Sequence, residues 1–131
     1  MSDRFTALSR GGLCTRVFSH ERVHILLHVR PDGDTIGSGA ALAGYFSALG
    51  KSATLVCADN IPERLEFITS RPIITPEEAL SDGVEYAVAV DAASPDQLGR
   101  AYELLGDKID CMIDHHSNGI KYADYFVNEK A

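Results

Sequence analysis

Residues 23–50 read VHILLHVRPDGDTIGSGAALAGYFSALG. The first seven residues form a nearly continuous apolar run, as buried parallel strands do. A charged turn follows, and from Asp34 onward apolar residues recur at helical spacing until Gly50, a typical residue for ending a helix. A buried strand joined by a short polar loop to a helix predicts the first unit of an α/β fold.

The rest of the chain repeats this alternation. Further apolar runs predict buried strands at SATLVCA (52–58), EYAVAVD (85–91) and IDCMID (109–114). Segments opening on Ser or Thr, then Pro and acidic residues, predict helices at 75–83 and 94–106, and a less regular helix is expected over roughly 3–17. We therefore expect one α/β domain over residues 1–131, with a doubly wound, mainly parallel sheet and flanking helices.

Composition restricts the class of protein. The 131 residues carry 12 Lys and Arg against 19 Asp and Glu, a formal charge of -7, which argues against non-specific binding of long duplex nucleic acid. The sequence lacks the apolar segments of a signal peptide or a membrane span. Its cysteines, Cys14, Cys57 and Cys111, are odd in number and widely spaced, which favours a reducing compartment such as the cytoplasm.

Polar side chains gather where the predicted strands end. They are His28, Asp32, Asp34, Asp91, Asp114, His115 and His116. Because the carboxyl ends of parallel strands meet at one edge of a sheet, these residues are expected to share a crevice. So many carboxylates would repel one another there without cations, so the pattern predicts bound divalent metal ions.

The donor types limit the metal and the chemistry. Carboxylate oxygens with a minority of imidazoles and no thiolate favour Mn²⁺, with Mg²⁺, iron or Co²⁺ also compatible, over structural zinc. Two such ions sharing a carboxylate can activate a bridging water and hold a phosphoryl oxygen. The expected reaction is hydrolysis of a phosphoester or phosphoanhydride.

The motifs HVRPDGDTIGS, an aspartate ending an intervening strand, and DHH ending a later one resemble those of the DHH phosphoesterase superfamily. That family includes RecJ-like exonucleases, oligoribonucleases that also dephosphorylate 3'-phosphoadenosine 5'-phosphate, cyclic dinucleotide phosphodiesterases and manganese pyrophosphatases. The segments PDGD, IGS and DHHSN are most similar to those of the oligoribonuclease and 3'-phosphoadenosine 5'-phosphate phosphatase branch.

The resemblance implies roles for individual residues. It assigns His28, Asp32 and Asp91 to one metal ion, and Asp34, Asp91 and His115 to the other, with a hydroxide between the two ions as nucleophile. His116 is expected to contact the substrate phosphate. Asp114 is expected to orient a metal-bound imidazole by contacting its other ring nitrogen.

The chain also departs from the family's pattern. Many relatives carry an arginine where this chain has Gln97, and the next arginine here is Arg100, three residues later. The contact that the relatives' arginine makes is therefore not assigned to a residue of this chain. Relatives continue beyond the DHH triplet to a fourth-motif aspartate and a smaller substrate-binding domain, whereas this sequence stops at Ala131. We therefore expect an incomplete catalytic domain with weak or no activity by itself.

Three functions remain open at this point. The primary expectation is a manganese-dependent phosphoesterase acting on a small nucleotide or short oligonucleotide, with self-association also compatible. The alternatives are a catalytically silent metal- or nucleotide-binding module and a hydrolase of pyrophosphate or polyphosphate.

Individual residues have structural alternatives as well. Ser38 is either a phosphate donor at a helix N-terminus or an ordinary first-turn serine. His24 is expected to be structural, because on a strand it lies about 13 Å from His28. Gly37 and Gly39 each cost the helix roughly 1 kcal/mol of stability relative to alanine. A close approach of the backbone either to a phosphate or to the sheet would explain why glycine stands at these positions.

Overall fold

The computed structural model describes residues 6–7, 10–17, 19–92, 94–114, 122–123 and 125–128. Within them, seven strands form one sheet in which every pairing is parallel, in the order β1-β7-β6-β5-β2-β3-β4. The strands are β1 (Thr6–Ala7), β2 (Arg22–Leu26), β3 (Ser52–Val56), β4 (Ile73–Ile74), β5 (Ala87–Val90), β6 (Ile109–Asp114) and β7 (Tyr125–Asn128). The α-helices are α1 (Arg10–Val17), α2 (Gly33–Ala48), α3 (Pro76–Asp82) and α4 (Arg100–Leu105), and the 3₁₀ helices are η1 (Glu63–Ile68), η2 (Pro95–Leu98) and η3 (Gly106–Lys108).

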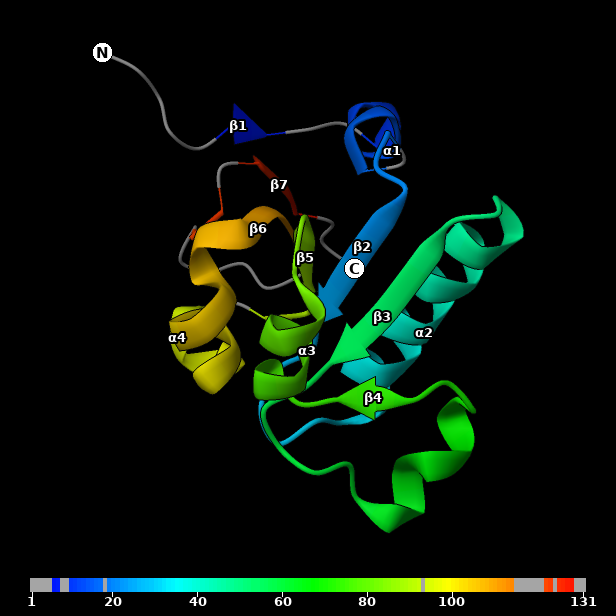
Figure 1. The fold of residues 1–131 in the computed structure, drawn as a ribbon, viewed down its shortest axis with the longest axis vertical. Coiled ribbons are helices and arrows are strands. Elements are labelled where there is room, and N and C mark those ends of the chain that lie inside the picture. The colour runs from blue at the N-terminus through cyan, green and yellow to red at the C-terminus, as the bar shows by residue number, and fades with distance from the viewer. Residues whose placement is uncertain are drawn as a thin grey trace.

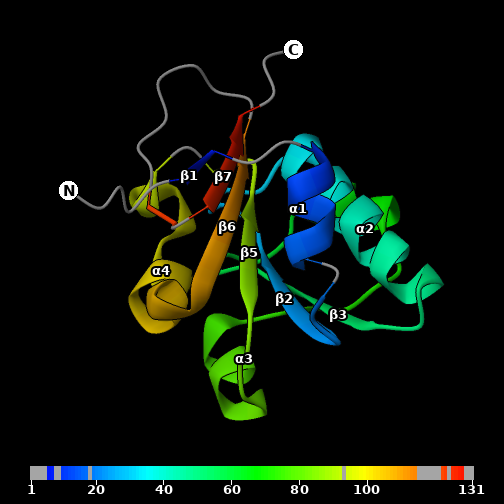
Figure 2. The ribbon, with the colours of Figure 1, turned by 90° about the horizontal axis from the view of Figure 1, so that it is seen from above.

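Helices cover both faces of the sheet (Figure 1). Helices α1 and α2 lie on one face and α3 and α4 on the other, as Figure 2 shows along the sheet. Each face buries its own apolar cluster, centred on Ile36 and Phe46 of α2 on the first face and on Ala101 and Leu105 of α4 on the second. The predicted doubly wound α/β fold is confirmed.

The chain reverses its direction across the sheet between β2 and β5. From β2 the chain proceeds outward through β3 and β4, and then returns to build β5, β6 and β7 on the other side. Such a switch point leaves a crevice at the carboxyl ends of the two central strands, where ligands bind in open α/β sheets. The loops after β2 and β5 carry the histidine and aspartates expected there.

The predicted strands and helices appear with shorter or shifted bounds. Helix α3 opens as expected, since Thr75 forms a capping box with Glu78 before Pro76. The helix predicted over 94–106 is wrong as one element, because Gly99 adopts φ +56° and separates η2 from α4. A Cβ atom at Gly99 would lie 2.7 Å from Cγ1 of Val29, so the absence of a side chain at Gly99 leaves room for Val29. The short strands β1, β4 and β7 were not predicted.

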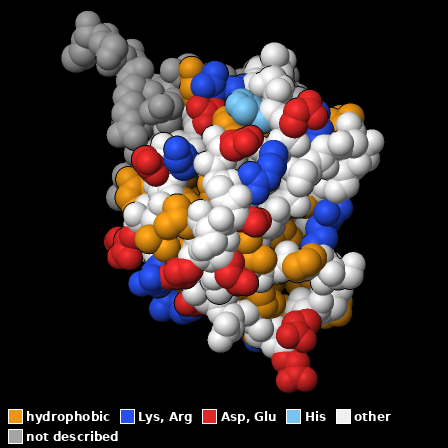
Figure 3. Space-filling model, viewed as in Figure 1, with side chains coloured by type: hydrophobic (Ala, Val, Ile, Leu, Met, Phe, Trp, Pro, Cys, Tyr) orange, Lys and Arg blue, Asp and Glu red, His pale blue; other side chains and the backbone are white. Residues whose placement is uncertain are grey.

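The surface shows no single charge dominating the face drawn in Figure 3. Acidic and basic side chains alternate over it with apolar ones. In the part of the chain that is described, no helix is both long and apolar enough to cross a membrane.

Candidate metal centre

His28 follows β2, and one of its ring nitrogens is already engaged. Its Nδ1 lies 2.7 Å from the carbonyl oxygen of Val29. A proton on Nδ1 donates to that carbonyl and leaves Nε2 with a free lone pair, the usual state of a metal-binding imidazole. Nε2 faces two carboxylates, at 3.5 Å from Oδ1 of Asp32 and 3.7 Å from Oδ2 of Asp91.

Asp32 is positioned by the start of α2. It is the N-cap residue, and its Oδ1 accepts a hydrogen bond of 3.0 Å from the backbone N–H of Thr35. This hydrogen bond is the main cause of a lowered pKa for Asp32, with the neighbouring His28 contributing less. The carboxylate is therefore held in its charged, cation-binding form at the positive end of the helix.

Asp91 directly follows β5 and is held in an unusual backbone conformation. Its φ of +56° lies in the left-handed region that residues other than glycine rarely adopt. Its N–H donates to the carbonyl of Ile113 on β6 at 2.8 Å, which extends the sheet pairing by one residue. The residue is buried at 9% exposure, so its carboxylate is largely shielded from solvent. Backbone strain of this kind is concentrated at functional sites.

These side chains form a group that suits a divalent cation. One ligand atom from each of His28, Asp32 and Asp91 lies within 4.8 Å of the other two. They open into a cavity of about 370 Å³ lined by His28, Val29, Arg30, Asp32, Asp34, Asp91, Asp96 and Gln97. One imidazole and two carboxylates are a hard, oxygen-rich donor set, which fits Mn²⁺ or Mg²⁺ better than a thiolate-preferring metal.

The remaining predicted site residues have different positions. Asp34 lines the same cavity but lies outside the three-residue group, and Ser38 is exposed on α2 without lining the cavity. Asp114 ends β6, where its backbone pairs with Asn128. His115 and His116 lie outside the described residues.

Two residues that support the site, Thr35 and Asp59, were not singled out from the sequence. Thr35 is fully buried, and its hydroxyl lies 3.4 Å from the backbone nitrogen of His28 and 3.5 Å from the carbonyl oxygen of Val90, so it links the loop after β2 to the end of β5. Its place three residues after Asp32 makes its backbone N–H a usual partner of an N-cap aspartate, and this spacing was the available signal. Asp59 accepts a hydrogen bond from the N–H of Arg30, which has φ +48°.

Gln97 stands where the sequence resemblance led us to expect an arginine. Gln97 lines the cavity, and its carbonyl accepts the N–H of Val29 at 2.6 Å, so its backbone holds the loop beside His28. Arg100 instead forms an ion pair with Glu77 of α3 on the surface. Arg100 is therefore an exposed helix residue that does not line the cavity.

Comparisons with known proteins agree with this geometry. Residues 22–131 match the family model described as the DHH family, N-terminal domain. The bifunctional oligoribonuclease and PAP phosphatase NrnA of Thermus thermophilus is 33% identical over 111 residues, which make up 80% of this chain and 31% of that protein. An exopolyphosphatase-related protein from Bacteroides fragilis shares the fold, with a TM-score of 0.75 and 19% identity over 87% of this chain and 37% of that one. The chain thus spans about a third of the length of these two proteins.

Proposed function

The chain belongs to the DHH family, and from this premise we propose that it provides the metal-binding part of a phosphoesterase. Residues 1–131 are part of one catalytic domain in this proposal. The observation that carries it is the group of His28, Asp32 and Asp91, whose ligand atoms lie within 4.8 Å of one another at the switch point of the sheet. Ionisable side chains that converge in a crevice are a common mark of a functional site.

We assign the metal as Mn²⁺. His28 Nε2 and the carboxylates of Asp32 and Asp91 would hold one ion, while Asp34 in the same cavity, Asp91 and His115 would hold a second. When bound, such ions supply a polarised phosphoryl oxygen and a water that is acidic near neutral pH.

The chain's own residues have distinct tasks in this reaction. The Val29 carbonyl orients the His28 ring, and the Thr35 N–H keeps Asp32 ionised. Asp91 belongs to both ligand sets and would therefore connect the two metal sites. We propose that His116 contacts the substrate phosphate, that Asp114 orients an imidazole, and that Ser38, exposed on α2, contributes no more than a peripheral contact.

We propose small nucleotides and short oligoribonucleotides as substrates. The 33% identical relative is named for oligoribonuclease and PAP phosphatase activities, which supports this class over inorganic polyphosphate. The polyphosphate alternative is supported only by a 19% identical neighbour, which shows the fold alone. With a formal charge of -7, the chain needs bound cations before a polyanionic substrate can approach the carboxylates. The buried free thiols of Cys57 and Cys111 are compatible with our expectation of a cytoplasmic protein.

Calorimetric titration with Mn²⁺ tests the metal proposal, with Asp91→Ala as the control. We expect two sites in the wild-type chain, the second weaker, and loss of both in the variant. Absence of Mn²⁺ binding in the wild-type chain would refute the proposed site.

Hydrolysis assays at one fixed Mn²⁺ concentration then test the substrate class. Dinucleotides, PAP, pyrophosphate and polyphosphate are compared on the same preparation. Faster turnover of dinucleotides or PAP supports the proposal, and faster turnover of pyrophosphate or polyphosphate supports the alternative. Metal binding without turnover of any of them would identify a silent binding module.

A further inference from the structure

Strand β6 contains one extra residue at Asp110. On β5, Ala87 and Val88 are consecutive, but they pair with Ile109 and Cys111 on β6, so Asp110 is skipped. This two-against-one pairing is a β-bulge, which is uncommon between parallel strands. Ile109 belongs to the apolar cluster under α4 and Cys111 to the cluster under α2, so the bulge leaves Asp110 and Cys111 on the α1 side of the sheet.

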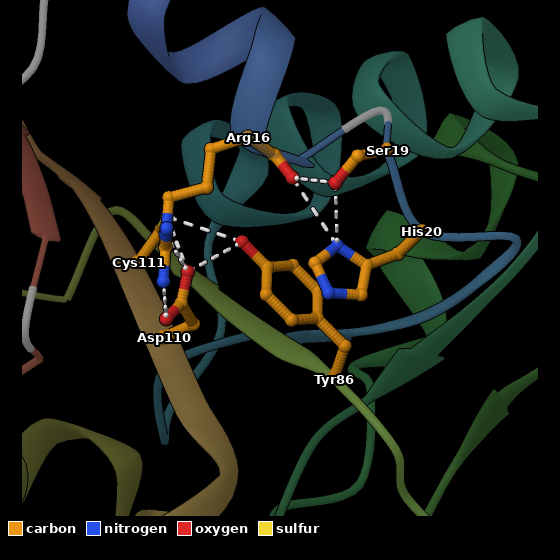
Figure 4. Close-up of polar contacts among 6 residues, drawn as sticks. All are labelled: Arg16, Ser19, His20, Tyr86, Asp110 and Cys111. Carbon is orange, nitrogen blue, oxygen red and sulfur yellow. Dashed lines mark hydrogen bonds and ion pairs between the residues drawn. The ribbon is translucent and has the colours of Figure 1, made fainter.

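The bulged aspartate is fixed by side chains from two other elements (Figure 4). Arg16 of α1 donates to both carboxylate oxygens of Asp110, from Nε at 2.6 Å and from a terminal nitrogen at 2.8 Å. The Tyr86 hydroxyl, just before β5, donates to Oδ2 at 2.7 Å. Arg16 also lies 3.6 Å from the centre of the Tyr125 ring, and the His20 ring stacks on Tyr86 at 3.6 Å.

Asp110 is charged in this arrangement. Burial alone would raise the pKa of its carboxyl group, but hydrogen bonds from Arg16, Tyr86 and Cys111 outweigh burial and lower that pKa. Charge-assisted, bidentate contacts of this kind are among the stronger and more directional hydrogen bonds in proteins. The network therefore stabilises one local geometry of the bulge.

The bulge sets the register of everything that follows it on β6. Val90 pairs with Ile113, and the carbonyl of Ile113 accepts the N–H of Asp91. A slip of one residue would move that acceptor by about 3.3 Å along the strand and turn each side chain to the opposite face. Asp91, whose backbone has φ +56°, would then lose this hydrogen bond.

We propose that Arg16, Tyr86 and Asp110 are positioning residues for the metal site, which they control by holding the bulge that sets the register of β6 against Asp91. The inference rests on the proposed metal-dependent function. It assigns a role to a polar network at the amino ends of the strands, about 10 Å along β6 from the residue that contacts Asp91.

Substitution and deletion at Asp110 have opposite expected consequences. Asp110→Ala keeps the extra residue but removes its contacts, so β6 can slip. Deletion of Asp110 removes the extra residue itself, and Ile109, Cys111 and Met112 then alternate between the two faces as an ordinary strand. We expect Asp110→Ala to weaken Mn²⁺ binding about tenfold, within the range for residues that support metal ligands, and the deletion to retain affinity within about threefold.

Two readouts accompany the calorimetry. Nuclear Overhauser contacts between backbone protons of Val88 and Cys111 report the register, and hydrogen exchange of the Asp91 amide reports its contact with Ile113. Both work without metal, so the register can be tested even if the wild-type chain binds no Mn²⁺ and the proposed function fails. Arg16→Gln, at a side chain that is 39% exposed, provides a milder variant if Asp110→Ala does not fold.

The matched control is Arg100→Gln, which removes another arginine–carboxylate pair, with Glu77, between α4 and α3. We expect it to leave Mn²⁺ affinity, the Val88–Cys111 contacts and Asp91 exchange unchanged. Unchanged register in both Asp110→Ala and Arg16→Gln would overturn the inference. Equal losses of affinity in Asp110→Ala and the deletion would also overturn it, because a general stabilising role predicts that result.

Discussion

The Nδ1 atom of His28 lies 2.7 Å from the carbonyl oxygen of Val29. The hydrogen bond fixes the tautomer in which Nε2 is free to bind a cation beside Asp32 and Asp91. The histidine thus enters the site already oriented by its own loop, so little ring motion is needed on binding.

His28→Ala is expected to abolish the first Mn²⁺ site. Loss of a direct ligand should weaken binding by more than about 100-fold, since even the outer partners of metal ligands cost roughly 10- to 100-fold. Calorimetric titration measures the change. Gln97→Ala is the control, because Gln97 lines the same cavity outside the three-residue group. An equal effect of both variants would mean that the cavity's shape, and not the imidazole, governs binding.

Asp91→Asn is expected to stabilise the metal-free chain and to lose the stabilisation that Mn²⁺ provides. The substitution removes repulsion between close carboxylates, worth about 1 kcal/mol at the high dielectric that the exposed Asp32 experiences. Asn also tolerates the left-handed backbone better than most residues. Thermal unfolding with and without Mn²⁺ measures both effects. The control Asp59→Asn should show no gain without metal, and a lower melting temperature for metal-free Asp91→Asn would contradict the prediction.

His24→Leu is expected to raise stability by about 1 kcal/mol at neutral pH. His24 is fully buried, and neither ring nitrogen has a hydrogen-bond partner among the described residues. Burial, followed by the charge of Arg22, lowers the pKa of His24. The unfolded chain therefore binds a proton more readily than the folded one, and this histidine costs stability as the pH falls below about 6.5.

Urea unfolding at pH 7.5, 6.5 and 5.5 checks this prediction. The stability difference between His24→Leu and the wild-type chain should widen as the pH decreases. A variant that is less stable at every pH would show that the ring's packing outweighs its unpaired nitrogens. This outcome would keep His24 structural, since it lies on β2 away from the metal group.

Local sequence patterns sufficed to predict the strand and helix of residues 23–50. An apolar run and helical spacing are properties of neighbouring residues, so they survive in the fold as β2 and α2. The gathering of His28, Asp32 and Asp91 was also predictable, because it follows from parallel strands sharing one carboxyl edge. The metal ligation itself stays a prediction.

Features that depend on distant partners could not be predicted. Gly99, where the predicted helix breaks, packs against Val29, which is far away in sequence. Asp110 at the bulge accepts hydrogen bonds from Arg16, 94 positions earlier, whereas the segment IDCMID alone reads as a regular strand. Single-sequence patterns contain no information on such pairings.

Gly37 and Gly39, near the start of α2, differ in how closely other residues pack against them. Gly39 is buried, and a Cβ atom there would lie 2.6 Å from Cδ2 of Leu27 and 3.3 Å from Cδ2 of Leu55. The sheet, and not a phosphate, therefore accounts for this glycine. At Gly37 a Cβ atom would meet nothing within 4 Å.

We expect Gly39→Ala to destabilise the chain by about 1–3 kcal/mol, because a fully buried leucine must move inside a packed core. Gly37→Ala, the matched control, should stabilise it by about 0.5–1 kcal/mol through helix propensity. Urea unfolding of both variants and the wild-type chain measures the difference in the free energy of unfolding. If Gly39→Ala stabilised the chain as much as Gly37→Ala, α2 would have to pack farther from β2 and β3. Asp32 at the start of that helix would then also lie farther from His28 than the structure shows.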